Sequence, residues 1–247
     1  MNQIRLKRIG SQISQELSNI ICTEAHDSLL HSITITGVVV TNDLGLAKVF
    51  FTSLNDTDHK KLEKELNDDT AGYLKSNGYN VKVLNLVNPA NSDGYNPLAH
   101  INSELDVDVI ANTVVKGQKG ESNADPYWDD MAELLLKSLI FYLLAKAPPE
   151  EQNLASCAEL VRAASSNGNS SLLSDLMNDL PYDHPARMYY KSIEIAPEKT
   201  YSSILSTLQS KLGKFDSKEI AELTSTDTIN FEDIGNKKTA VYVISSD

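Results

Sequence analysis

Apolar residues at the start of the chain show the spacing of an amphipathic helix. They recur at intervals of three and four, which places them on one helix face: Ile9, Ile13, Leu17, Ile20 and Ile21. Three basic residues, Arg5, Lys7 and Arg8, stand at the head of this helix. The pattern therefore predicts a helix with one apolar face and a positively charged start.

Two strands and a second helix are predicted next. Residues 33–40 are rich in β-branched side chains and predict a strand, and residues 46–53 alternate between two faces and predict the return strand. Residues 55–58 are typical of a helix cap, and the helix that they precede is expected over about 59–66. The order is helix, strand, strand, helix.

A block of helices between two strands is predicted for the rest of the chain. Residues 80–87 and 239–244 predict the strands. The longest helix is expected to begin at Pro126, with Asp125 as its N-cap, and to end at Pro148-Pro149. Further helices are predicted over 105–115, 153–165, 171–180, 186–195, 201–212 and 217–223. This order is typical of an α/β sheet that is interrupted by an all-helical subdomain.

Pairing of the two outer strands stays open at this stage. Residues 80–87 can pair with 239–244, or they can complete the sheet of the first segment. The helical block depends least on this choice, because its contacts are internal.

Charge is distributed unevenly along the chain. The net charge is −12, which argues against a general polyanion binder, because phosphate backbones require clustered Lys and Arg. Residues 1–76 carry 8 basic and 10 acidic side chains, whereas the remainder carries 14 and 24. The first segment is therefore the part better suited to nucleic acid.

Cysteine usage and hydropathy indicate a cytoplasmic protein. Cys22 and Cys157 lie far apart without paired spacing, so free thiols are expected. The N-terminus lacks the apolar core of a signal peptide. The most apolar stretch, 134–147, is shorter than the ~20 residues that a membrane span needs. We expect no membrane insertion by this chain.

The first 76 residues resemble ribosome-binding factor A. The resemblance rests on the run Arg5–Ile9, on Gln12-Ile13 and Glu16-Leu17, on Asp43–Phe50 after the strand 33–40, and on Ala71–Ser76. It implies a small KH-like αββα unit that binds the small ribosomal subunit and assists maturation of its rRNA. Arg5, Lys7 and Arg8 are then the candidate RNA-binding residues, and a solvated helix end is the alternative. The resemblance stops after Ser76, so the family's last strand and its basic run are expected to be missing.

Residues 68–247 resemble an interior fragment of the type IV coupling proteins of conjugation systems. The residues that carry this resemblance are Gly78–Leu86, Tyr95–Leu98, Asp125–Trp128, Lys199–Leu205, Leu223–Ser225 and Ile234–Ala240. The family consists of membrane-anchored, hexameric, ATP-driven DNA translocases that recruit a relaxase–DNA complex. Its helical subdomain is associated with substrate recognition. By this resemblance, residues of about 122–230 retain that subdomain.

ATP hydrolysis is not expected. A phosphate-binding loop requires Gly-x-x-x-x-Gly-Lys-Ser/Thr, and the nearest run, Gly213-Lys214-Phe215, lacks the first glycine and the hydroxyl. The resemblance places that loop upstream of Tyr79 and the acidic magnesium motif downstream of 239–244. We therefore expect no enzyme activity and no cofactor.

Other candidate chemistry has simpler explanations. The five histidines are dispersed, so a zinc site has no support, and His184 is expected at the surface. Asp129, Asp130 and Glu133 suit the positive end of a helix dipole better than a metal site. Trp128 is expected to anchor the core rather than to stack on a base.

These patterns predict an α+β chain of two fused parts. A truncated KH-like αββα unit (1–76) precedes an incomplete α/β nucleotide-binding-domain remnant (77–247) with its helical subdomain. The segment 69–76 fits both families and is the expected junction. The predicted function is relaxase or relaxosome recognition by the helical part. The alternatives are a ribosome-assembly factor and a recombinant product without function.

Overall fold

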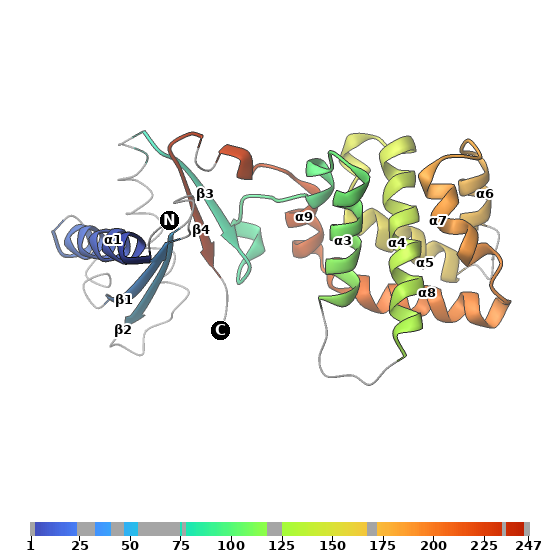
Figure 1. Cartoon of the computed structure of the whole chain (residues 1–247), viewed down its shortest axis with the longest axis horizontal. Coiled ribbons are helices and arrows are strands. Elements are labelled where there is room, and N and C mark those ends of the chain that lie inside the picture. The colour runs from blue at the N-terminus through green and yellow to red at the C-terminus, as the bar shows by residue number, and fades with distance from the viewer. Residues whose placement is uncertain are drawn as a thin grey trace. The chain divides into compact units, whose positions relative to one another are not determined.

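The chain forms two compact units. The computed structural model describes residues 3–23, 33–40, 47–53, 75, 78–117, 125–166, 172–233 and 236–244. One unit comprises Met1–Asp93 and Ile229–Asp247, and the other is Gly94–Thr228. The second unit is thus inserted between two parts of the first (Figure 1). The combination of helices with small sheets confirms the α+β class.

A helix and a hairpin begin the first unit. Helix α1 (Gln3–Thr23) packs on strand β1 (Ile33–Val40), which pairs in antiparallel fashion with β2 (Ala47–Ser53). A Cβ at Gly10 would lie 2.7 Å from the Val38 carbonyl oxygen, so glycine permits the close approach of α1 to β1. These three predicted elements are confirmed. The helix expected over 59–66 and the junction 69–76, except Lys75, lie outside the described residues.

A parallel strand pair completes the first unit. Strand β3 (Asn80–Asn85) pairs with β4 (Thr239–Ile244) along all of its length, from Asn80 opposite Thr239 to Asn85 opposite Ile244. The structure therefore decides the question that the sequence left open. Strand β3 ends two residues earlier than predicted, because the Asn85 side chain accepts hydrogen bonds from the Val87 and Asn88 backbone N–H groups and turns the chain.

The second edge of β3 is occupied by its own loop. The Val83 N–H donates to Asp93 Oδ2 at 2.9 Å, and the Asp93 N–H donates to the Val83 carbonyl at 2.7 Å. The Asn85 N–H donates to Ser92 Oγ at 2.8 Å. This edge is consequently protected against pairing with another strand.

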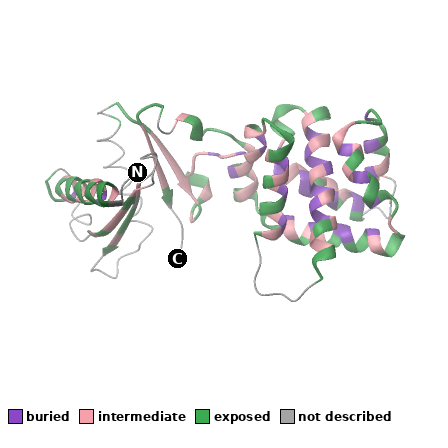
Figure 2. Ribbon diagram, in the orientation of Figure 1, coloured by how far each residue is buried: buried purple, intermediate pink, exposed green. Residues whose placement is uncertain are grey.

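The inserted unit is helical, and α4 (Pro126–Lys146) runs through its core. The other helices are α3 (Glu104–Lys116), α5 (Leu154–Ser166), α6 (Leu172–Asn178), α7 (Pro185–Glu194), α8 (Glu198–Leu212) and α9 (Lys218–Ser225). The α4 residues Leu135, Leu136, Leu139 and Ile140 are fully buried, and α3, α5, α7 and α8 contact this helix (Figure 2). All predicted helices of the block exist, with ends that shift by up to three residues.

Helix α3 shares the core of the inserted unit. Its residues Val107, Ala111 and Val115 are fully buried in the same apolar cluster as α4. The compact helical unit is Gly94–Thr228, and α3 belongs to it. Among the described helices, none combines the length and the apolar character needed to cross a membrane.

Candidate functional site

The basic head of α1 is open to solvent. Arg5, Lys7 and Arg8 are exposed, and no described residue forms an ion pair with them. A shallow depression lies along this face of the helix and is lined by Ile4, Lys7, Arg8, Ser11, Gln12, Gln15 and Glu16. Two cations and three neutral polar side chains at one open surface suit contact with a phosphate backbone. The depression also holds Glu16, which reduces its positive charge.

The acidic cluster of α4 forms ion pairs between helices. Glu133 Oε2 lies 2.9 Å from Lys116 Nζ of α3, and Glu133 Oε1 lies 2.8 Å from Lys137 Nζ one turn along α4. Asp130 also contacts Lys116, at 2.9 Å, and Asp129 contacts Lys211 of α8 at 3.0 Å. The three carboxylates thus connect α4 to two neighbouring helices, in addition to lying near its N-terminus.

Glu133 remains ionised in this setting. Burial alone would raise the pKa of its carboxyl, but the hydrogen bonds from Lys137 and Lys116 outweigh burial and hold that pKa below its ordinary value. The bond to Glu133 likewise raises the pKa of the Lys116 ammonium. A carboxylate that is charged at neutral pH and already paired with two lysines is a poor acid–base catalyst. Within the described ranges no cluster of His, Cys, Asp and Glu could hold a metal ion.

Two residues singled out in the sequence have structural roles. Trp128 is partly buried against the core, which confirms the predicted anchor. The Tyr127 ring meets the Trp128 ring edge-on, with 5.2 Å between the ring centroids. His184 caps α7, because its Nδ1 accepts a hydrogen bond from the Ala186 N–H at 3.2 Å. Its position directly before Pro185 was the available signal for this cap, since proline favours the first helical position.

The two chain segments that bound the inserted unit are joined by hydrogen bonds. The Thr228 N–H donates to the Gly94 carbonyl at 2.9 Å, and the Gly94 N–H donates to Thr228 Oγ1 at 3.0 Å. The Tyr95 N–H donates to the Leu223 carbonyl at 2.9 Å. We call Gly94–Asn96 together with Asp227–Thr228 the junction clasp.

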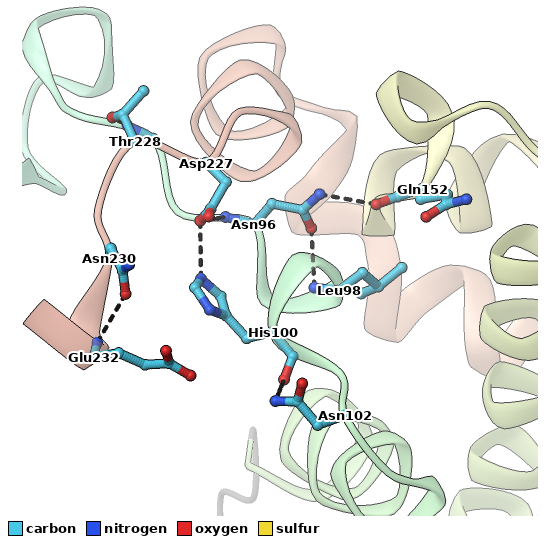
Figure 3. Close-up of polar contacts among 10 residues, drawn as sticks. Asn96, Leu98, His100, Asn102, Gln152, Asp227, Thr228, Asn230 and Glu232 are labelled. Atoms are coloured by element: carbon cyan, nitrogen blue, oxygen red, sulfur yellow. Dashed lines mark hydrogen bonds and ion pairs between the residues drawn. The ribbon is translucent and has the colours of Figure 1, made fainter.

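Polar side chains reinforce the junction clasp (Figure 3). Asp227 Oδ1 lies 3.0 Å from His100 Nε2 and accepts a hydrogen bond from the Asn96 N–H at 3.3 Å. The His100 ring stacks on the Tyr95 ring, with 5.3 Å between the ring centroids. The buried Asn96 side chain donates to the Gln152 carbonyl at 2.8 Å. Sequence reasoning missed this cluster, because Asp227 and His100 are far apart in the chain.

Apolar side chains remain exposed on the outside of the inserted unit. Leu105 and Val109 share one face of α3 and are 72% and 65% exposed. Tyr182, Met188 and Ile195 lie in or beside α7 and are exposed to a similar degree. Exposed apolar groups at helical spacing are typical of protein-binding surfaces rather than of enzyme pockets.

Comparison with known proteins identifies both parts of the chain. A family model described as "Ribosome-binding factor A" matches residues 5–80. A curated ribosome-binding factor A from Staphylococcus carnosus (strain TM300) is 40% identical over 79 residues, which cover 32% of this chain and 64% of that relative. The chain therefore spans less than two thirds of the relative that it matches.

The second match covers most of the chain. A family model described as "Type IV secretory system Conjugative DNA transfer" matches residues 49–246. The two matched ranges overlap at 49–80, which contains the predicted junction at 69–76. Both resemblances found in the sequence are thus confirmed. The chain belongs to the type IV secretory system conjugative DNA transfer family and carries, ahead of its helical unit, a segment similar to ribosome-binding factor A.

Proposed function

We propose that the helical unit Gly94–Thr228 binds a protein of the DNA-transfer apparatus, a relaxase or another relaxosome component. The observation that carries this proposal is that one family match spans the whole of a unit with its own apolar core and exposed apolar helix faces. The net charge of the chain, −12, favours a protein partner over direct binding of DNA.

This binding role is proposed without ATP hydrolysis by the 247 residues. No phosphate-binding motif occurs in them. The nearest run, Gly213–Asp216, forms a 3₁₀ turn directly after α8. A phosphate-binding loop instead connects a strand to the N-terminus of a helix. Magnesium-dependent phosphate release from ATP at a rate above the buffer background would contradict this part of the proposal.

Binding is tested with the full chain and a purified relaxase of the same conjugative element. Isothermal titration calorimetry is expected to show saturable binding in the micromolar range. A second protein of similar size and charge, unrelated to conjugation, serves as the control. Absence of binding, both in calorimetry and in a pull-down, by a chain whose circular dichroism shows it to be folded would refute the relaxase as the partner.

The first segment supports a second candidate function, binding to the small ribosomal subunit. The 40% identity to a ribosome-binding factor A and the exposed Arg5, Lys7 and Arg8 favour it. In this proposal residues 1–76 form a KH-like unit, of which the structure describes one helix and two strands. Three cations support only weak, salt-sensitive binding.

Cosedimentation with small ribosomal subunits at low salt tests this candidate. The variant Arg5→Glu/Lys7→Glu/Arg8→Glu is expected to lose cosedimentation. The matched control reverses three exposed lysines of the helical unit, Lys199→Glu/Lys214→Glu/Lys218→Glu, and is expected to retain it. Equal loss in both variants would show a general effect of charge, and absence of wild-type cosedimentation would remove the candidate.

The third alternative, a recombinant product without function, is tested at the junction. Single-molecule sequencing of DNA and transcript across codons 60–90 distinguishes one continuous reading frame from two separate genes. A continuous frame supports both binding proposals. Two separate genes would mean that each part acts only within its own parent protein.

A further inference from the structure

Helix α7 presents an apolar stripe to solvent. Met188 of α7 and Ile195, the C-cap residue that follows the helix, are 63% and 79% exposed. They lie seven residues apart, and Ile195 keeps a helical backbone conformation, so both lie on the same side, with Lys191 and Ser192 between them. Tyr182, in the turn before the helix, is 71% exposed.

The opposite face of α7 fixes the helix in the core. Ala186, Tyr190 and Ile193 are buried there. The Tyr189 ring stacks on Phe141 of α4 with a centroid distance of 5.8 Å and an interplanar angle of 2°. The stripe is therefore held rigidly, which lowers the entropic cost of binding a partner.

Two cations are positioned beside the stripe. Lys191 Nζ donates a hydrogen bond to Tyr182 Oη at 3.0 Å and lies 5.2 Å from the ring centroid. The Arg187 guanidinium lies 5.4 Å from the same centroid and donates to the Leu180 carbonyl at 3.2 Å. The bond from Lys191, together with the positive charge of both residues, lowers the pKa of the Tyr182 phenol.

Nearby carboxylates leave this positive charge only partly balanced. The Glu194 carboxylate lies close enough to act on the Lys191 charge, and its Oε1 also accepts a hydrogen bond from Ser174 Oγ of α6 at 2.8 Å. Asp183 is exposed directly before α7, where the helix dipole favours a negative charge. The helical unit as a whole has 11 basic and 20 acidic residues, so a surface with two fixed cations differs from its surroundings.

We propose that the α7 face, defined as Tyr182, Arg187, Met188, Lys191 and Ile195, docks an acidic amphipathic helix of a partner protein. The inference rests on the protein-binding role proposed above and assigns it a surface. Apolar side chains at helical spacing provide anchors for the apolar side of such a helix. The two cations select acidic flanks and disfavour basic ones. A nucleic acid would require a larger basic area than this acidic unit provides.

Two synthetic helical peptides test the selectivity of the α7 face on the full chain. Both carry Leu at spacings of three and four, one with Glu and the other with Lys at the flanking positions. Fluorescence anisotropy is expected to show micromolar binding of the acidic peptide and binding at least about tenfold weaker for the basic peptide. Equal binding of both peptides, or no binding of the acidic one, would overturn the inference.

Matched variants test the location. Met188→Gln/Ile195→Gln is expected to weaken binding of the acidic peptide about tenfold, because both apolar anchors are removed while helix propensity is kept. Leu105→Gln/Val109→Gln removes a similar exposed pair from α3 and is expected to leave the affinity for the acidic peptide unchanged. Lys191→Glu is expected to lower affinity for the acidic peptide and raise it for the basic one. Weaker binding of the acidic peptide in Leu105→Gln/Val109→Gln, together with unchanged binding in Met188→Gln/Ile195→Gln, would contradict the assignment to the α7 face.

The relaxase titration separates this inference from the proposed function. Relaxase binding that is unchanged in Met188→Gln/Ile195→Gln would leave the binding role intact and refute the α7 face. Absence of relaxase binding to the folded wild-type chain would refute the proposed partner.

Discussion

Glu133 illustrates how single residues hold the helical unit together. Its carboxylate meets two lysines and also accepts a hydrogen bond from Asn112 Nδ2 at 3.2 Å. A buried group with this many partners is costly to leave unsatisfied, whereas an exposed pair contributes little.

Glu133→Gln is expected to lower the free energy of unfolding by about 1–3 kcal/mol at neutral pH, because two lysines lose their shared counter-charge. Urea denaturation measures this loss. The control is Asp179→Asn, which removes the exposed pair with Lys146 and is expected to change stability little. A larger effect in the control would contradict the assigned role.

The pH dependence of this difference follows from the lowered pKa of Glu133. A carboxyl whose pKa is lower in the folded state stabilises the fold fully above its ordinary pKa, and this contribution is lost as the pH falls through the folded value. The gap between wild type and Glu133→Gln is therefore expected to shrink below pH 4.5, the ordinary value. A gap that widens on acidification would contradict the ion-pair account.

The two cysteines are expected to differ in reactivity. Both are free thiols, as the sequence predicted, with Cys22 exposed and Cys157 buried. Burial raises the pKa of the Cys157 thiol to about 12, which suppresses the reactive thiolate. An aromatic disulfide reagent at neutral pH should label Cys22 rapidly and Cys157 only on unfolding. Rapid labelling of both thiols in the folded chain would contradict the packing of α5.

Residue roles that depend on local sequence were predictable, and those that depend on distant neighbours were not. Asp125 caps α4 by accepting from the Tyr127 N–H at 3.0 Å, as its place before Pro126 indicated. Asp129 pairs with Lys211, and Asp227 with His100, only because the fold brings α8 to α4 and the two clasp segments together. Helix spacing alone carries no information about such pairs.

At the scale of elements, the junction clasp fixes the two ends of the inserted unit. A Cβ at Gly94 would overlap Thr226 Oγ1 and would lie 2.6 Å from the Thr226 carbonyl oxygen. Because one of the atoms that the Cβ would meet belongs to the backbone, the overlap can be relieved only if the two segments of the clasp move apart.

Gly94→Ala is expected to weaken the clasp. Hydrogen exchange at the Thr228 amide should accelerate, because its bond to the Gly94 carbonyl is lost, and stability should fall by about 1–3 kcal/mol. Gly213→Ala is the matched control, since nothing lies within 4 Å of its Cβ. Unchanged exchange at Thr228 in Gly94→Ala would show that the clasp does not depend on this close approach.

Element boundaries show where periodicity stops being informative. The strands 33–40 and 239–244 were predicted with the bounds that the structure has. Helix α8 begins at Glu198, three residues before the predicted start at Tyr201. The apolar pattern missed this first turn because its residues are polar and add nothing to the apolar stripe. Parallel pairing of β3 with β4 joins strands separated by the whole helical unit, and no local pattern could establish it.

At the scale of the whole molecule, the apolar core is concentrated in the helical unit. Among buried apolar residues of the described ranges, all except Ile21 and Ile229 lie in Gly94–Thr228. Two-stranded sheets bury little surface and are marginal without further support. The two units are therefore expected to differ in resistance to unfolding.

Limited proteolysis with subtilisin, followed by mass spectrometry, measures this difference. Peptides from α1, β1 and β2 are expected to be released early, while those from α4 persist, because cleavage requires local opening. Persistence of the α1–β2 segment after α4 has been degraded would contradict the assignment of the main core to the helical unit.

Recognition of a conjugative DNA-transfer protein by the helical unit is the proposal on which the others depend. Hydrogen–deuterium exchange of the full chain with and without a saturating purified relaxase tests it most directly. Protection is expected within residues 94–228, strongest at α7, with unchanged exchange in residues 3–53. Protection confined to residues 3–53, or none anywhere in the folded chain, would contradict it.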